Sequence, residues 1–222
     1  MRAKTLKPPP GFTRKGNLLL PKHHSVADWD FEFGATKRSL SSARYVSPPT
    51  SLCILEPTGT PFFDVILCRV PGTLCLPQGE VRNWHYYHYS DSRVAMFRNQ
   101  SPLGSAINDN YYEVYLISTT ARLYSKSAGI LTKRDETSCQ TFTDQWAHYR
   151  VVFWNGYTPL AVEALCVNLY REIAGEWVQE GETMYHTGNL WKDSEINRIG
   201  FHAHSLANWP EYWDDTEIWA PE

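Results

Sequence analysis

The stretch TDQWAHYRVVFWNGYTPLAVEALCVNL, residues 143–169, predicts two long strands joined by a turn. Its first half alternates with a period of two, which is typical of a half-buried strand. One face is apolar and the other is mixed and rich in rings: Ala147, Tyr149, Val151 and Phe153 against Trp146, His148, Arg150, Val152 and Trp154. Asn155-Gly156 predicts the turn, because both residues tolerate positive φ. The second half is almost wholly apolar, which predicts a strand covered on both sides within a sheet.

The remaining chain favours the same class of structure. From residue 29 onward, short strand-like segments alternate with Gly and Pro, and no stretch keeps helical periodicity over three turns. Many short strands with such breaks are typical of a β-sandwich or barrel. We therefore predict one all-β domain over residues 29–222, a two-sheet antiparallel β-sandwich with the hairpin of residues 143–169 as its scaffold.

Charge and cysteine content argue against several classes of protein. A net charge of −3 disfavours nucleic-acid binding by the chain as a whole. Five cysteines without a CxxC spacing predict reduced thiols. No apolar h-region follows Met1 and no apolar run reaches the length of a membrane span. We expect synthesis in the cytoplasm without a signal peptide, and no membrane partner.

Residues 1–28 predict an extended, Pro-rich basic arm. Six cations face the single acid Asp28 there, and Pro8-Pro9-Pro10 favours polyproline II. Residues 176–222 are acidic, so the arm and the acidic end either meet, within one molecule or between neighbours, or are both solvated. We predict that the arm contacts other subunits through two cations and an apolar plug: Arg14, Lys15, Leu18, Leu19 and Leu20.

Four motifs resemble those of concanavalin A-like, or laminin-G-like, jelly-roll domains and related carbohydrate-binding sandwiches. They are WDFE at residues 29–32, QWAHYRVV at 145–152, IGF at 199–201 and WDDTEI at 213–218. The opening GNLL at 16–19, followed by a sandwich, is also similar to modules of bacteriophage tail and head proteins. The resemblance implies a two-sheet jelly roll whose first and last strands are adjacent. That fold hosts lectins, glycosidases, lyases and structural modules, so it does not by itself choose a function.

The aromatic run at residues 83–89 is the candidate carbohydrate-binding site, through Trp84, His85, Tyr86 and Tyr87. Rings beside polar groups suit the faces of pyranose sugars. Alternation divides this run between two faces of a strand, so the alternative is that its rings fill the core or a subunit interface.

The resemblance also implies a structural calcium that ties the first strand to the last. Glu32, Asp214 and Asp215 are its candidate ligands, since calcium prefers carboxylate oxygens. The alternative is that the two aspartates cap a loop and are solvated. We expect no other cofactor.

No catalytic residue is assigned. The carboxylate string of the glucanases that share this fold is absent. Unbroken alternation would place two acids and two rings of the last strand on one face: Asp215, Glu217, Trp213 and Trp219. A lyase would need His, Tyr, Arg and Gln together, and His148 and Arg150 share a face.

We predict a non-enzymatic structural or adhesive protein of a large assembly, such as a capsid-decorating or tail-associated protein of a virion. It would form homo-oligomers through the basic arm. The alternative is a lectin-like carbohydrate-binding module, and a polysaccharide hydrolase or lyase is the less favoured third hypothesis.

Overall fold

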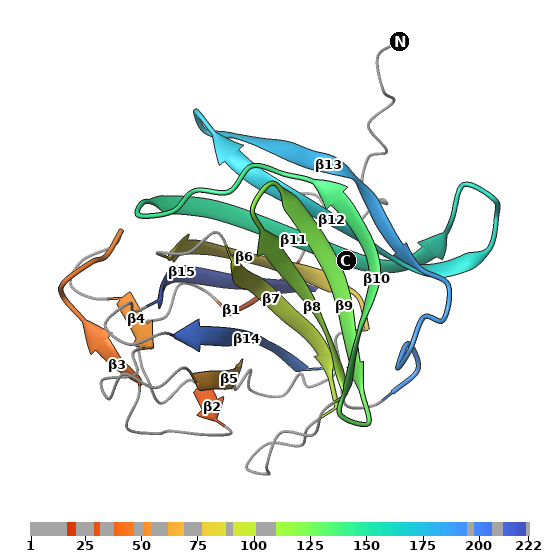
Figure 1. Cartoon of the computed structure of the whole chain (residues 1–222), viewed down its shortest axis with the longest axis horizontal. Coiled ribbons are helices and arrows are strands. Elements are labelled where there is room, and N and C mark those ends of the chain that lie inside the picture. The colour runs from red at the N-terminus through yellow and green to blue at the C-terminus, as the bar shows by residue number, and fades with distance from the viewer. Residues whose placement is uncertain are drawn as a thin grey trace.

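The computed structural model describes ten segments of the chain. They are residues 17–20, 29–31, 38–46, 51–54, 62–68, 77–87, 91–100, 110–194, 198–205 and 211–220. The regular elements in these segments are all strands, and they form two antiparallel sheets (Figure 1). The predicted all-β, two-sheet antiparallel sandwich is confirmed. In these segments no helix is long and apolar enough to cross a membrane.

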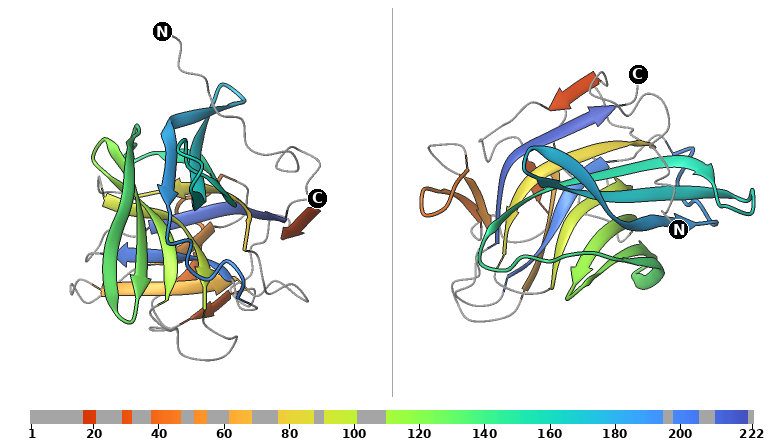
Figure 2. Two further views of the ribbon diagram at one scale, coloured as in Figure 1. Left: turned by 90° about the vertical axis from the view of Figure 1, so that its right-hand side faces the viewer. Right: turned by 90° about the horizontal axis from the view of Figure 1, so that it is seen from above.

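Sheet A carries the central hairpin. Its strand order is β13 (Glu176–His186), β12 (Glu163–Ile173), β11 (Trp146–Tyr157), β6 (Gly79–Tyr86), β15 (Glu211–Ala220), β4 (Ser51–Ile54) and β3 (Arg38–Ser41), and β1 (Asn17–Leu20) also pairs with β15. Sheet B has the order β10 (Ile130–Ser138), β9 (Thr120–Ser127), β8 (Tyr111–Ile117), β7 (Asp91–Asn99), β14 (Arg198–Ser205), β5 (Phe62–Cys68) and β2 (Trp29–Phe31). Figure 2 shows the two sheets from the side and from above.

The apolar core lies between the sheets, as alternation on β11 predicts. Ala147, Tyr149, Val151 and Phe153 all belong to the buried cluster. The Phe153 ring stacks on Phe97 of sheet B, with centroids 4.3 Å apart. The outward residues of β11 are therefore available for something other than holding the sheets together.

The predicted hairpin is confirmed, but its predicted turn is wrong. Asn155 and Gly156 lie within β11 and pair with Leu165 and Ala164 of β12. The turn lies at residues 158–162, where the Ala161 N–H donates to the Thr158 carbonyl at 2.9 Å. Gly156 is needed for space: a Cβ there would lie 2.8 Å from the Trp154 indole nitrogen and 2.9 Å from the Cys166 sulfur.

Side chains of β10 join the open edge of sheet A to sheet B. The Tyr185 N–H of β13 donates to an Asp135 carboxylate oxygen at 2.7 Å, and the Glu182 N–H donates to the Thr137 hydroxyl at 2.6 Å. These bonds occupy backbone groups that would otherwise offer a template for another strand.

The segment Asn17–Leu20, which the sequence places in the arm, pairs with β15 of its own chain. Asn17 lies opposite Ala220 and Leu18 opposite Trp219, so the first and last strands are adjacent. Arg14 and Lys15 lie outside the described residues. The role of the arm in assembly stays a prediction.

A matched pair of substitutions tests the position of the turn. Gly156→Ala should lower the free energy of unfolding by about 1–3 kcal/mol, because the methyl group overpacks the site between Trp154 and Cys166. Leu160→Ser, in the exposed turn itself, should change it by less than about 0.5 kcal/mol. Urea unfolding followed by fluorescence measures both. Equal stability of the two variants would contradict this account of Gly156.

His186 gives the fold a sensitivity to acid. Tyr112 donates its O–H to His186 Nδ1 at 2.5 Å and accepts the Leu190 N–H at 2.9 Å. Burial lowers the pKa of His186 from 6.5 to about 4, and the nearby Arg134 and Arg98 add to this. The neutral imidazole is therefore the form that the fold stabilises.

Because this folded-state pKa is depressed, the stability it contributes is present above pH 6.5 and is lost as the pH falls toward 4. Between pH 7 and 4.5 the loss should be about 2 kcal/mol after allowance for partial exposure. His186→Asn keeps an acceptor for Tyr112 but does not titrate, so its unfolding free energy should fall less over this range. Urea unfolding of both proteins at the two pH values measures this loss. An equal fall in unfolding free energy in both proteins would exclude His186 as the source of the acid sensitivity.

Candidate functional site

The outer face of sheet A, which points away from sheet B, carries an unusual density of rings and charges. It arises because the strands that bury one set of alternate residues must direct the other set outward. The outward residues include Glu80, Arg82, Trp84 and Tyr86 on β6, Trp146, His148, Arg150 and Trp154 on β11, Tyr170 and Glu172 on β12, Trp177 on β13, and Asp214, Glu217 and Trp219 on β15.

Three rings, from β6, β11 and β13, form a row across the outer face of sheet A. His148 lies directly opposite Trp84 in the register of β11 and β6. Their rings stack with centroids 4.5 Å apart and planes 12° apart. On the other side, the His148 ring lies 4.6 Å from the Trp177 ring. We call Trp84, His148 and Trp177 the ring row.

A carboxylate orients the imidazole in the middle of the ring row. His148 Nδ1 lies 2.5 Å from a Glu172 oxygen. Burial lowers the pKa of His148, while Glu172 acts in the opposite direction. A neutral imidazole that donates its Nδ1–H to Glu172 keeps Nε2 as a hydrogen-bond acceptor.

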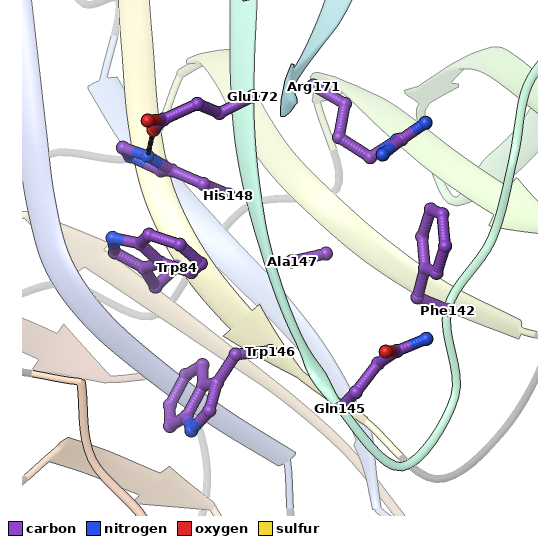
Figure 3. A pocket seen from close by; sticks show the side chains of 8 residues that line it. All are labelled: Trp84, Phe142, Gln145, Trp146, Ala147, His148, Arg171 and Glu172. Carbon is purple, nitrogen blue, oxygen red and sulfur yellow. Dashed lines mark hydrogen bonds and ion pairs between the residues drawn. The ribbon is translucent and has the colours of Figure 1, made fainter. Parts of the chain in front are cut away.

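An open pocket of about 280 Å³ lies beside the ring row, where β12 separates from β11. Pairing of these strands begins at Tyr149 and Arg171, so residues 146–148 pair with β6 alone. Figure 3 shows two groups of side chains on either side of β11. The lining consists of Trp84, Trp146, His148 and Glu172, together with Phe142, Gln145, Ala147 and Arg171.

Arg171 is held by its own neighbours in the pocket. Its Nε donates to Glu180 at 2.7 Å and a terminal nitrogen donates to Gln140 at 2.8 Å. The guanidinium also lies 4.4 Å from the centre of the Phe142 ring. These contacts fix its plane as one wall of the pocket.

A network of ion pairs continues the face beyond the ring row. Glu80, whose side chain is 3% exposed, accepts from Arg82 Nε and from Arg150 at 2.6 Å. Arg82 also lies 3.6 Å from Glu217. Each guanidinium lies near a ring as well, Arg82 at 4.8 Å from Trp219 and Arg150 at 5.0 Å from Tyr170.

The structure divides the four predicted sugar-binding residues between two faces. Trp84 lines the pocket. Tyr86 is on the same face, but Trp146 and Tyr212 cover its ring and leave it 3% exposed. His85 and Tyr87 are buried in the core, so they cannot contact a ligand on the outer face.

His85 belongs to a buried polar cluster that is not arranged as a catalytic triad. Glu211 and Ser92 each lie 3.3 Å from the same ring nitrogen, Nε2. A nucleophile–base–acid triad needs its two partners on opposite nitrogens of the imidazole.

The structure describes two of the three candidate metal ligands, Asp214 and Asp215. Asp214 accepts the Val46 N–H at 2.6 Å and the Asp215 N–H at 2.8 Å, as the capping alternative predicts. The solvated part of that alternative is wrong, because both aspartates are buried. Among the described residues no three His, Cys, Asp or Glu side chains could hold a metal ion. Glu32 lies outside these residues, and the calcium site stays a prediction.

The prediction that alternation continues unbroken along the last strand is wrong. The register of β15 against β6 shifts between Asp214 and Glu217, and Asp215 has a φ of 45°. Trp213 is consequently in the core. Glu217 and Trp219 face outward, opposite Arg82 and Glu80.

Sequence reasoning did not identify several residues of the face. It noted His148 and Arg150 but treated their hairpin as scaffold. The alternation at residues 172–178 is weak, so it gave no reason to join Glu172 and Trp177 to Trp84. The register of β6, β11, β12 and β13 is what brings Glu172 and Trp177 to the same face as Trp84.

Comparison with known proteins places the fold. The sequence matches no protein-family model and no curated protein. An alginate lyase from Aplysia kurodai is similar in structure, with a TM-score of 0.60 and 10% identity over 92% of this chain and 98% of that one. A xylan beta-1,4-xylosidase from Bacillus halodurans has a TM-score of 0.54 and 11% identity, and the match covers 96% of this chain and 41% of that enzyme.

A third similar structure is a protein of unknown function from Shewanella oneidensis, with a TM-score of 0.51 and 13% identity over 90% of this chain and 81% of that one. The fold is a jelly-roll β-sandwich. At such identities the likeness establishes the fold alone, which supports that part of the resemblance and provides no link to bacteriophage proteins.

The contact between His148 and Glu172 can be tested by titration. Glu172 raises the pKa of His148 against the effect of burial. Glu172→Gln removes that opposing charge, so the pKa of His148 should fall below its wild-type value. NMR titration of the imidazole resonances measures the shift. An unchanged or higher pKa would contradict the contact.

Proposed function

We propose that this protein binds carbohydrate on the outer face of sheet A, at the ring row and the adjoining pocket. The observation that carries this proposal is the row of Trp84, His148 and Trp177 beside a pocket lined by polar groups. Aromatic rings contact the apolar faces of sugars, and polar groups at their edges orient the hydroxyls.

The carboxylates of the face favour binding over glycoside cleavage. Hydrolysis needs one carboxyl group as a proton donor and a second that is free to act as nucleophile or base. Glu80 accepts from both Arg82 and Arg150 and is almost fully buried, so both of its neighbours and its lack of access set it apart from an approaching ligand. Glu217 lies beside Arg82 and accepts the Trp219 indole N–H at 3.1 Å. Neither is placed as a proton donor.

The similar structures agree with this proposal without establishing it. The lyase and the xylosidase are named for polysaccharides, but a shared fold does not assign a function. The predicted role in a large assembly includes adhesion, and adhesion to glycans is the part that the ring row supports. A virion role has no support beyond the sequence.

Removing a ring of the row should weaken binding while the fold remains. We expect Trp84→Ala and Trp177→Ala each to weaken binding at least about tenfold, or about 1.4 kcal/mol, because a stacking surface is lost. Tyr157→Ala is the matched control: its ring is 69% exposed at the end of the hairpin, remote from the row along β11. It should bind as the wild type does.

A panel of soluble polysaccharides in native affinity gels measures the binding, and circular dichroism checks the fold. If the wild type is retarded by no polysaccharide, or if Trp84→Ala binds as tightly as Tyr157→Ala, the proposal fails.

A further inference from the structure

Carboxylates outnumber guanidiniums on the outer face of the central strands β12, β11, β6 and β15. Apart from Asp214, which is buried and accepts backbone N–H groups at the end of the face near Arg44, three carboxylates stand there against two guanidiniums: Glu80, Glu172 and Glu217 against Arg82 and Arg150. His148 does not restore the balance, because its lowered pKa favours the neutral ring. The face therefore carries a net negative charge.

The two guanidiniums are also less accessible than two of the carboxylates, Glu172 and Glu217. The side chains of Arg82 and Arg150 are 14% and 11% exposed. Those of Glu217 and Glu172 are 21% and 29% exposed. An approaching ligand thus meets the negative groups of this network more readily than the positive ones.

A ligand carboxylate would have to compete with Glu80 for either arginine. Glu80 is held by both guanidiniums and is nearly inaccessible to water. Displacing it would leave a buried charge without its partners, which is strongly unfavourable.

One end of the face carries an exposed cation. Arg44 lies 4.2 Å from the centre of the Tyr86 ring. Tyr86 is beyond Trp84 on β6, at the opposite end of the strand from Glu80. Arg44 therefore does not offset Glu217 or the carboxylate network around Glu80.

We propose that the outer face of sheet A selects uncharged polysaccharides and excludes polyuronates such as alginate. This inference rests on the proposed carbohydrate-binding function and adds the chemical class of the ligand. An uncharged hydroxyl can donate to His148 Nε2 or to the Glu172 carboxylate, whereas a uronate brings a like charge to Glu172 and Glu217.

The first test compares the wild type in native affinity gels that contain xyloglucan, arabinoxylan, alginate or polygalacturonate. Retardation by at least one of the two neutral polymers and by neither anionic polymer is the expected result. Retardation by alginate or polygalacturonate that equals or exceeds that by the neutral polymers overturns the inference but keeps the proposed function. Retardation by none of the four overturns the inference.

The second test reverses the exclusion. Glu217→Gln removes a carboxylate that lies beside Arg82, so alginate affinity should rise at least about tenfold and fall again with salt. Glu136→Gln is the matched control, because it makes the same charge change on β10 of sheet B, beside Arg122 and Lys133. It should leave alginate affinity unchanged. No gain in Glu217→Gln, or an equal gain in both variants, overturns the role given to the carboxylates.

Discussion

The antiparallel register between β6 and β11 is the constraint on which the outer face depends. It sets His148 opposite Trp84, Arg150 opposite Arg82 and Val152 opposite Glu80. A slip of one residue would turn the apolar set of β11 outward and the rings inward, so burial of the core holds the register in place. The stability of the sandwich and the geometry of the ring row therefore have the same origin.

The paired arginines show how this face tolerates so much charge. Arg150 lies opposite Arg82 across the two strands, a like-charge pair that would be destabilising alone. Glu80 lies next to both and accepts from each. Because the acid is buried, its two partners are difficult to exchange for a ligand, and the pair acts as a rigid border to the ring row.

The sequence predicts which residues of one strand share a face, but it does not predict which residues lie opposite one another on paired strands. Alternation on β11 identified both faces correctly, because an apolar set at every second residue has one stable orientation. The turn predicted from Asn155-Gly156 was wrong, because Gly156 is needed instead for room beside Trp154 and Cys166. The predicted sugar site kept His85 with Trp84, although alternation places neighbours in a strand on opposite faces. Glu172 and Trp177 join the face only through pairing across β11, β12 and β13.

The register shift in β15 explains why the faces of the last strand could not be predicted from its sequence. Up to Asp214, even-numbered residues face outward, and beyond the shift odd-numbered residues do. Without that shift Ile218 would face outward and Glu217 would enter the core, where Ile218 is buried instead. The positive φ of Asp215 is the local cost of this change. The register shift brings Glu217 and Trp219 to Arg82. The charge of the outer face therefore depends on a backbone distortion that the pattern of residues does not predict.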